Sequence, residues 1–229
     1  MYGVYNLICI IQARMSSNRL PMKMLRLVNK KNLLERVHSQ VLKSKKINLA
    51  IVATSLNKED DLIYKFCKKK NFNVFRGSLN DVSKRFIDVI NYYSAESFIR
   101  INGDSPFILP NIIDKAVNLF NRSGVDLVTN IYPRSYPKGQ SVEIINSKTF
   151  IKSYKFQNNS QKEHVTKYFY DNFKNYKIKN FKLNTDFNYL SLAIDNQYDL
   201  KNARKIAKIF DKKNLNIEEL IDSIIMVRS

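Results

Sequence analysis

The sequence has few cysteines and no long apolar run. Only two of its 229 residues are cysteines. Cys9 and Cys67 lie far apart and lack the spacing of metal ligands, so we expect both to be small buried residues. No apolar stretch approaches the ~18 residues that span a bilayer, and the N-terminus lacks a signal-peptide pattern. The sequence therefore predicts a soluble, cytoplasmic protein without a membrane partner.

Glycine-rich phosphate motifs are also missing. The sequence contains five glycines, and they form neither a Gly-x-x-x-x-Gly-Lys-Ser/Thr loop nor a Gly-x-Gly-x-x-Gly loop after the first strand. This disfavours the P-loop and dinucleotide-binding classes. There is no Gly-x-Ser-x-Gly nucleophile elbow and no clustered His/Cys metal site. Any phosphate binding must therefore use a different kind of loop.

Acidic residues are scarce relative to basic ones. The chain has 39 Lys and Arg against 20 Asp and Glu, a net charge of +19. A basic surface attracts phosphate backbones, so a nucleic-acid-binding module is one alternative. The lysines are scattered among many Asn and Ile residues, however, as a compositional bias would produce. We therefore expect no nucleic-acid partner, although the positive potential would help to attract an anionic substrate.

Strand and helix patterns alternate through the first half of the chain. Apolar runs predict buried strands at 7–11, 49–54, 74–75, 97–101 and 125–129. Apolar residues at helical spacing predict helices at 33–42, 60–69, 82–93 and 112–120. This βαβ alternation favours a mainly parallel sheet with helices on its faces.

The alternation changes after residue 131. The pattern predicts a loop, a half-exposed strand at 142–145, helices at 148–156 and 162–172, and a strand within 176–183. The chain then returns to the core with a strand at 190–194 and helices at 198–210 and 217–226. We predict a single domain over 1–229, in which 1–131 and 184–229 form a nucleotide-binding core and 132–183 is an inserted lobe.

A polar loop carrying three cations follows the first predicted strand. Arg14, Arg19 and Lys23 supply positive charge, while Ser16, Ser17 and the backbone amides supply hydrogen-bond donors. In a parallel sheet this loop lies at the carboxyl edge, where open α/β sheets bind ligands. The loop is therefore predicted to bind phosphates.

Two aspartates follow other predicted strands. Asp104 and Asp195 would share the sheet edge with the basic loop, and carboxylates with substrate phosphates satisfy the oxygen coordination of Mg²⁺. Alternatively, each could be a helix N-cap. His38 is expected to be a surface residue. His164 adjoins Glu163, which suits an acid/base or ligand role, although it could simply begin a helix.

Seven stretches together resemble a known family. They are 11–23 (IQARMSSNRLPMK), 52–55 (VATS) with 59–61 (EDD), 74–78 (VFRGS) with 81–82 (DV), 100–106 (RINGDSP), 136–139 (YPKG), 163–166 (EHVT) and 193–195 (AID). The chain resembles the acylneuraminate and 3-deoxy-manno-octulosonate cytidylyltransferases, and most closely the branch of the spore-coat polysaccharide biosynthesis protein F. This implies a Rossmann-like nucleotide-diphospho-sugar transferase fold (GT-A-like) with an inserted acceptor and dimerisation lobe.

The resemblance also implies a reaction. CMP would pass from CTP to an acidic sugar or related acidic acceptor, with release of pyrophosphate, for surface polysaccharide or glycan biosynthesis. Mg²⁺ would be the cofactor, and the enzyme would be a homodimer. A non-catalytic nucleotide-binding homologue is the alternative within the family.

Residue roles carry over by position. The resemblance implies that Arg14, Lys23, Asp104 and Asp195 are catalytic, and that the two aspartates hold the metal. The implied nucleotide-binding residues are Ala13, Arg14, Ser16, Ser17, Lys23, Ala53, Thr54, Ser55, Arg76, Arg100, Asn102 and Asp104. The implied acceptor-binding residues are Lys138, Gln140, Glu143, Glu163 and His164.

The sequence departs from this branch at two places. Ser16 and Met22 stand where the branch often has glycine, and they adopt positive φ less freely. Gln140 and Ser141 replace a hydrophobic residue and an aspartate. The first change concerns triphosphate binding, and the second predicts a different or more negatively charged acceptor.

Overall fold

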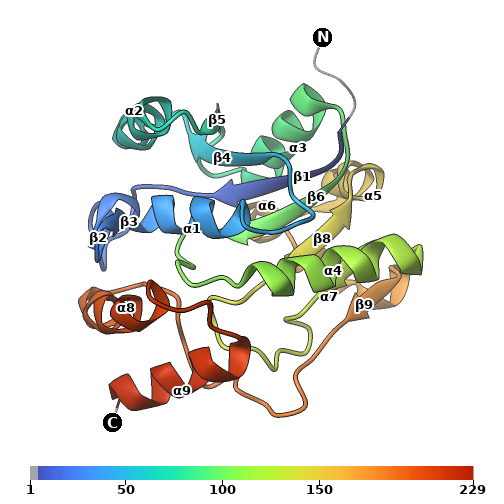
Figure 1. Cartoon of the computed structure of the whole chain (residues 1–229). Helices are drawn as coiled ribbons and strands as arrows, with labels where there is room; N and C mark the ends of the chain where they lie inside the picture. The colour runs from blue at the N-terminus through green and yellow to red at the C-terminus, as the bar shows by residue number, and fades with distance from the viewer. Residues whose placement is uncertain (1–4, 229) are drawn as a thin grey trace.

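A mixed, mainly parallel sheet forms the centre of the protein, as a computed structural model shows for residues 5–228 (Figure 1). Its strand order is β5-β4-β1-β6-β8-β7-β9. The strands are β1 (Tyr5–Gln12), β4 (Ala50–Ser55), β5 (Asn73–Gly77), β6 (Ala95–Asn102), β7 (Leu127–Thr129), β8 (Glu143–Asn146) and β9 (Ile178–Asn180). A separate hairpin pairs β2 (Leu27–Val28) with β3 (Lys31–Asn32). The predicted α/β class is confirmed.

Strand β1 lies inside the sheet and is buried on both faces. In β1, Ile8 and Ile10 enter one apolar core while Cys9 and Ile11 enter the other, because successive side chains point to opposite faces. β1 pairs in parallel with β4 and β6, whereas β8 runs antiparallel to both of its neighbours. The carboxyl ends of β4, β1 and β6 therefore meet at one edge.

Helices cover both faces of the sheet (Figure 1). They are α1 (Leu33–Val41), α2 (Asp61–Lys69), α3 (Val82–Tyr93), α4 (Pro110–Ser123), α5 (Ser147–Ser153), α6 (Asn159–Glu163), α7 (Lys167–Asp171), α8 (Gln197–Phe210) and α9 (Ile217–Arg228). Short 3₁₀ turns are η1 (Lys23–Leu25), η2 (Lys58–Asp60), η3 (Tyr154–Phe156) and η4 (Phe173–Asn175). The apolar sides of α1 and α4 pack on one face, and those of α3 and α5 pack on the other.

Three predicted elements differ from the structure. Residues 190–194 do not join the sheet: their alternating burial matches a strand, but the β-pairing of this segment is limited to an isolated bridge between Ser191 and Lys138. The helix predicted at 162–172 is broken into α6 and α7, because the chain leaves helical geometry at His164. The strand predicted as half-exposed is β8, which is buried from Glu143 to Ile145 because it pairs on both sides.

The segment predicted as an insertion contributes to the main sheet. Residues 132–183 supply β8, which pairs with β6 and β7, and β9, which pairs with β7. These two strands are therefore part of the same sheet as β1, while α5, α6 and α7 connect them. Within residues 5–228, no helix combines the length and apolar character needed to cross a bilayer.

Both cysteines and one histidine are buried. Cys9 and Cys67 are free thiols, and burial raises the pKa of each, which keeps them protonated and unreactive. His38 was expected at the surface, and that prediction is wrong: it is 6% exposed, with its ring stacked 3.6 Å from that of Phe72. Burial lowers the pKa of His38 to about 4.

The buried His38 predicts a loss of stability in mild acid. The unfolded chain takes up a proton at His38 near pH 6.5, whereas the folded chain does so only near pH 4, so stability falls as the pH drops from 6.5 toward 4. We expect a loss of about 2 kcal/mol between pH 7.5 and pH 5, measured by urea denaturation at each pH. His38→Gln should flatten this dependence.

The second histidine provides the control. His164 is exposed, so His164→Gln should leave the pH dependence unchanged. An equal slope in wild type and His38→Gln would show that His38 does not cause the effect.

Candidate active site

The basic loop after β1 is fixed by one buried carboxylate. Asp60, 1% exposed, accepts hydrogen bonds from the Met15 amide (2.6 Å), the Ser55 amide (3.1 Å) and the Ser55 hydroxyl. The Ala13 amide also donates to the Ala53 carbonyl at 3.1 Å. The loop is therefore attached to the end of β4, which limits where its cations can lie.

Replacing Asp60 by asparagine should disturb this attachment. In asparagine an NH₂ group replaces one carboxylate oxygen, and this group would face the hydrogen-bond donors of Ser55 or Met15. A hydrogen bond to the charged carboxylate would then be lost, and such a bond contributes ~1.5–3 kcal/mol to stability. Under the reaction that the family resemblance implies, we expect Asp60→Asn to raise the KM for CTP about tenfold, since 1.4 kcal/mol is tenfold. Initial rates of pyrophosphate release would measure it.

The neighbouring aspartate is a matched control. Asp61 is more exposed and forms an ion pair with Arg76 at 2.7 Å. Because exposed ion pairs contribute little, Asp61→Asn should change the KM less than about twofold. Equal effects of the two substitutions would contradict an anchoring role for Asp60.

Lys23 joins the two predicted metal-binding aspartates. Its Nζ lies 3.4 Å from Asp104 Oδ2 and 3.1 Å from Asp195 Oδ1, and its side chain is 10% exposed. Arg19 also approaches Asp195, at 3.5 Å. The Ile194 amide donates to the Asp104 carbonyl at 3.0 Å, which holds residues 194–195 beside the end of β6. The two aspartates therefore meet although residues 190–194 are not a strand.

Neither aspartate caps a helix. The N-cap of α8 is Asn196, whose side chain accepts from the Asp199 amide, and the N-cap of α4 is Leu109. The alternative interpretation of Asp104 and Asp195 as caps is therefore wrong. Their carboxylates are free to face the basic loop.

These groups line a pocket of about 630 Å³ at the sheet edge. Its lining residues are Gln12, Arg14, Ser16, Ser17, Asn18, Arg19, Lys23, Met24, Asn102, Gly103, Asp104, Glu163, His164 and Asp195. Arg14 forms an ion pair with Glu163 at 3.5 Å, so residues from β1, β6, α6 and the start of α8 meet here. The volume is typical of a small-molecule site.

The donor set fits a hard cation that also binds substrate. Asp104 and Asp195 offer carboxylate oxygens that already share one cationic partner, Lys23. Within residues 5–228, no three His, Cys, Asp or Glu side chains are grouped closely enough to hold a metal ion. Mg²⁺ suits such a site because it usually takes one or two carboxylates and completes its shell with phosphate oxygens and water.

Several predicted nucleotide-binding residues lie outside the pocket lining. Ala13, Ala53, Thr54 and Ser55 are fully buried or nearly so, so only backbone groups there can face a ligand. Arg76 donates to the Ser55 and Asn57 carbonyls and pairs with Asp61. Its guanidinium therefore shapes the turn after β4.

Arg100 and Glu143 form a buried pair instead of contacting the pocket. Arg100 Nη1 lies 2.5 Å from Glu143 Oε2, and Glu143 is 1% exposed. Glu143 also accepts a hydrogen bond from Tyr170, and burial together with this carboxylate raises the pKa of Tyr170 well above 10. Because Glu143 is enclosed, the implied acceptor-binding role does not fit it.

Gln140 is also structural. It is fully buried, accepts from the Leu109 amide and donates to the Phe107 carbonyl. Its side chain therefore holds backbone groups and does not line the pocket. Lys138 is exposed but is not part of the pocket lining. Its backbone pairs with residues 190–192.

The two substituted loop positions differ in their backbone conformation. Met22 has φ 58°, in the left-handed region where glycine is favoured, whereas Ser16 is not among the positive-φ residues. Such a conformation costs a non-glycine residue of the order of 1 kcal/mol. The expected restriction therefore applies at Met22 and not at Ser16.

Sequence reasoning missed two charged residues near the site. Asp60 lies in the 59–61 stretch, but the resemblance implies no role for it, and Arg85 lies outside all seven stretches. Arg85 is fully buried; its Nη1 donates to the Ser78 carbonyl, while Nε and Nη2 have no partner among the described residues. Burial lowers the pKa of Arg85 to about 10, Asp60 raises it and Arg14 lowers it. A helical pattern alone carries no signal for such a residue.

Cations and two carboxylates around a pocket at the carboxyl edge of a mainly parallel sheet define a nucleotide-binding α/β enzyme. A family model described as cytidylyltransferase matches residues 8–225. The chain belongs to the cytidylyltransferase family and is a CTP-dependent nucleotidyltransferase.

Individual relatives agree with this assignment. The chain is 30% identical to the spore coat polysaccharide biosynthesis protein SpsF of Bacillus subtilis, over 94% of this chain and 92% of that protein. It is 30% identical to a 3-deoxy-manno-octulosonate cytidylyltransferase of Chlorobaculum parvum, over 56% of this chain and 52% of that protein. The structure of a cytidylyltransferase from Leptospira borgpetersenii superposes with a TM-score of 0.90 at 27% identity, covering 96% of this chain and 94% of that one.

Proposed function

We propose that the protein transfers CMP from CTP to an acidic sugar or a related acidic acceptor, with release of pyrophosphate, for surface polysaccharide or glycan biosynthesis. The observation that carries the proposal is the single pocket that holds Arg14, Lys23, Asp104 and Asp195. The similarity to relatives named for 3-deoxy-manno-octulosonate and for spore-coat polysaccharide supports a sugar-acid acceptor.

The pocket's charges suit both substrates. Arg14, Arg19 and Lys23 are permanent cations beside the donors of Ser16 and Ser17, a set that binds triphosphate oxygens. Arg14 is half-exposed, and Arg19 is more exposed still. Either can therefore also attract the carboxylate of an acidic acceptor. Glu163 and His164 lie on the α6 side of the same pocket.

The reaction forms one bond and breaks one bond at the α-phosphorus. An acceptor hydroxyl oxygen attacks in line, loses its proton, and the bond to the pyrophosphate oxygen breaks. Negative charge increases on the bridging and terminal oxygens as this happens, and preorganised cations stabilise it. Lys23, which two carboxylates hold in the pocket, supplies one of these cations. His164, which is exposed in the same pocket, can accept the acceptor's proton.

Asp104 and Asp195 would hold the Mg²⁺ ion. When bound, the ion neutralises phosphate charge and acts as a Lewis acid toward the phosphoryl oxygens. Before the substrate and the ion bind, Lys23 keeps the two carboxylates close together. The arrangement of this chain's residues is thus set before the triphosphate arrives.

Pyrophosphate release tests the proposed reaction. The purified protein would be incubated with CTP, Mg²⁺ and a panel of sugar acids, and the CMP-linked product identified by mass spectrometry. At least one acceptor should give product, with ATP, GTP and UTP reacting more slowly. CTP binding without release with any acceptor would favour the alternative, a non-catalytic nucleotide-binding homologue.

We also propose a homodimer formed through residues 132–183. Tyr132, Phe156 and Phe173 are exposed there, and the rings of Tyr132 and Phe173 lie 6.1 Å apart. Exposed apolar side chains commonly mark protein interfaces. Light scattering after gel filtration should give twice the chain mass, and Phe156→Ser with Phe173→Ser should give the monomer. A monomeric wild type would contradict the proposal.

A further inference from the structure

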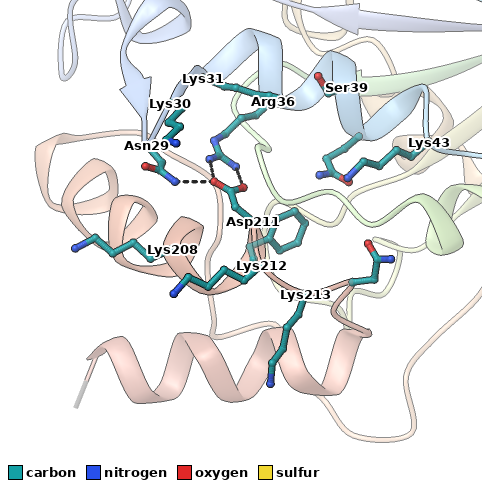
Figure 2. Close-up of a pocket in the computed structure, with 13 residues that line it drawn as sticks. Asn29, Lys30, Lys31, Arg36, Ser39, Lys43, Lys208, Asp211, Lys212 and Lys213 are labelled. Atoms are coloured by element: carbon teal, nitrogen blue, oxygen red, sulfur yellow. Dashed lines mark hydrogen bonds and ion pairs between the residues drawn. The ribbon is translucent and has the colours of Figure 1, made fainter.

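A second pocket lies away from the active site. It has a volume of about 790 Å³ and is formed by the β2–β3 hairpin, α1 and the end of α8 with the residues that follow it (Figure 2). α8 begins two residues after Asp195 and ends at Phe210, so its length, about 21 Å for 14 residues, separates the two pockets. A ligand here would not contact the reacting phosphates.

The charge lining this second pocket is almost entirely of one sign. Six lysines line it: Lys30, Lys31, Lys43, Lys208, Lys212 and Lys213. The one acidic lining residue is Asp211, and its carboxylate is occupied. It accepts two hydrogen bonds from Arg36, at 2.8 and 2.6 Å, and one from Asn29 at 2.7 Å. Asp211 thus forms its close ion pair with Arg36 and not with any of the six lysines.

The distinguishing feature of this pocket is the concentration of lysines around one concave surface. Some lysines elsewhere pair with acids, as in Lys70 with Glu35, Lys84 with Asp88 and Lys167 with Asp171. None of the six pocket lysines forms an ion pair within residues 5–228. Like charges gathered around a concave surface repel one another, and a bound anion would relieve that repulsion.

The pocket is built on a fixed frame. Arg36, 3% exposed, reaches from α1 to Asp211 and also donates to the Val28 carbonyl at 2.6 Å. Arg204 donates to the Leu27 carbonyl at 3.1 Å. Figure 2 shows this Arg36–Asp211 pair between the lysines of the hairpin and those that follow α8. The lysine side chains thus extend from elements that these hydrogen bonds hold together.

We propose that this pocket binds a small ligand carrying several phosphate groups. Lysine ammonium groups act as point charges that match closely spaced phosphates of varied geometry. The lining has a single aromatic side chain, Phe210, which does not provide the stacking platform of a single-strand nucleic-acid site. The limited volume of the pocket, about 790 Å³, favours a compact polyanion over an extended strand.

Calorimetry with inorganic tripolyphosphate tests the proposal on the full chain at ~0.15 M salt. Wild type should show two binding events, because the active-site pocket also binds phosphates. Lys212→Gln with Lys213→Gln should weaken one event tenfold or more, as expected for losing two charge-assisted contacts. It should leave the other event unchanged.

A matched double variant controls for net charge. Lys148 and Lys152 are exposed on α5, and replacing both by Gln should preserve both events. If the wild type and both double variants each show a single tripolyphosphate-binding event, and CTP displaces it, the second site would be overturned while the proposed function stays intact. Oligonucleotide binding that disappears in the Lys212/Lys213 variant, without a second tripolyphosphate event, would overturn it in favour of nucleic acid. Two events in a protein that releases no pyrophosphate would separate this site from the proposed function.

Discussion

Asp195→Asn is expected to lower kcat by about 10³-fold, the size of effect seen when a group that stabilises transition-state charge is lost. Asp195 shares Lys23 with Asp104, and under the proposed function both carboxylates hold Mg²⁺. A neutral amide binds this ion more weakly, so the Mg²⁺ concentration for half-maximal rate should also rise. Asp104→Asn should behave alike. Initial rates over a Mg²⁺ series would measure both effects.

Asp186→Asn is the control for this experiment. Asp186 is exposed, and among the described residues its carboxylate accepts hydrogen bonds from Asn188 alone, so its substitution should leave kcat and the Mg²⁺ dependence unchanged. Circular dichroism would show that each variant is folded. Near-normal turnover in a folded Asp195→Asn protein would rule out its assignment as a metal ligand.

Arg100→Met is expected to destabilise the protein by about 3–5 kcal/mol, the usual cost of removing one partner of a buried ion pair. Glu143 would be left as a buried carboxylate, 1% exposed, with Tyr170 as its remaining hydrogen-bond donor. β8 would also lose a side-chain link to β6, since Arg100 and Glu143 are register partners. Urea denaturation would measure the change in the free energy of unfolding.

The double variant separates the ion pair from other roles of Arg100. Arg100→Met with Glu143→Gln removes both charges of this pair and should recover much of the lost stability. If Arg100 instead contacts the nucleotide, as the family resemblance implies, the single variant would raise the KM for CTP and leave stability unchanged. That result would contradict the structural role assigned here.

Local patterns in the sequence were enough to predict the parallel part of the sheet. Continuous apolar runs identify β1 and β4, and a mostly apolar run identifies β6, because strands buried on both faces carry apolar side chains on both faces. The loop after β1 and the residue after β6 then follow from the rule that parallel strands end at one edge. Arg14, Lys23 and Asp104 could therefore be assigned to one site without a structure.

Partners far apart in the sequence were decided only by the tertiary structure. The predicted strand before Asp195 does not exist, yet Asp195 still reaches Lys23, 172 residues away. Arg100 and Gln140 look like ligands by position but pair with Glu143 and with backbone groups near α4. Side-chain pairing of this kind has no period that a sequence pattern could reveal.

The sequence by itself determined the fold class, the family and the composition of the basic loop, because these depend on periodicity and on short motifs. The structure alone decided that Asp60 fixes the loop and that His38 is buried. It also decided that lysines near residue 30 meet lysines near residue 212 around one pocket. The physical reason is that burial and electrostatic environment arise from packing between distant segments, whereas secondary structure depends largely on neighbours along the chain.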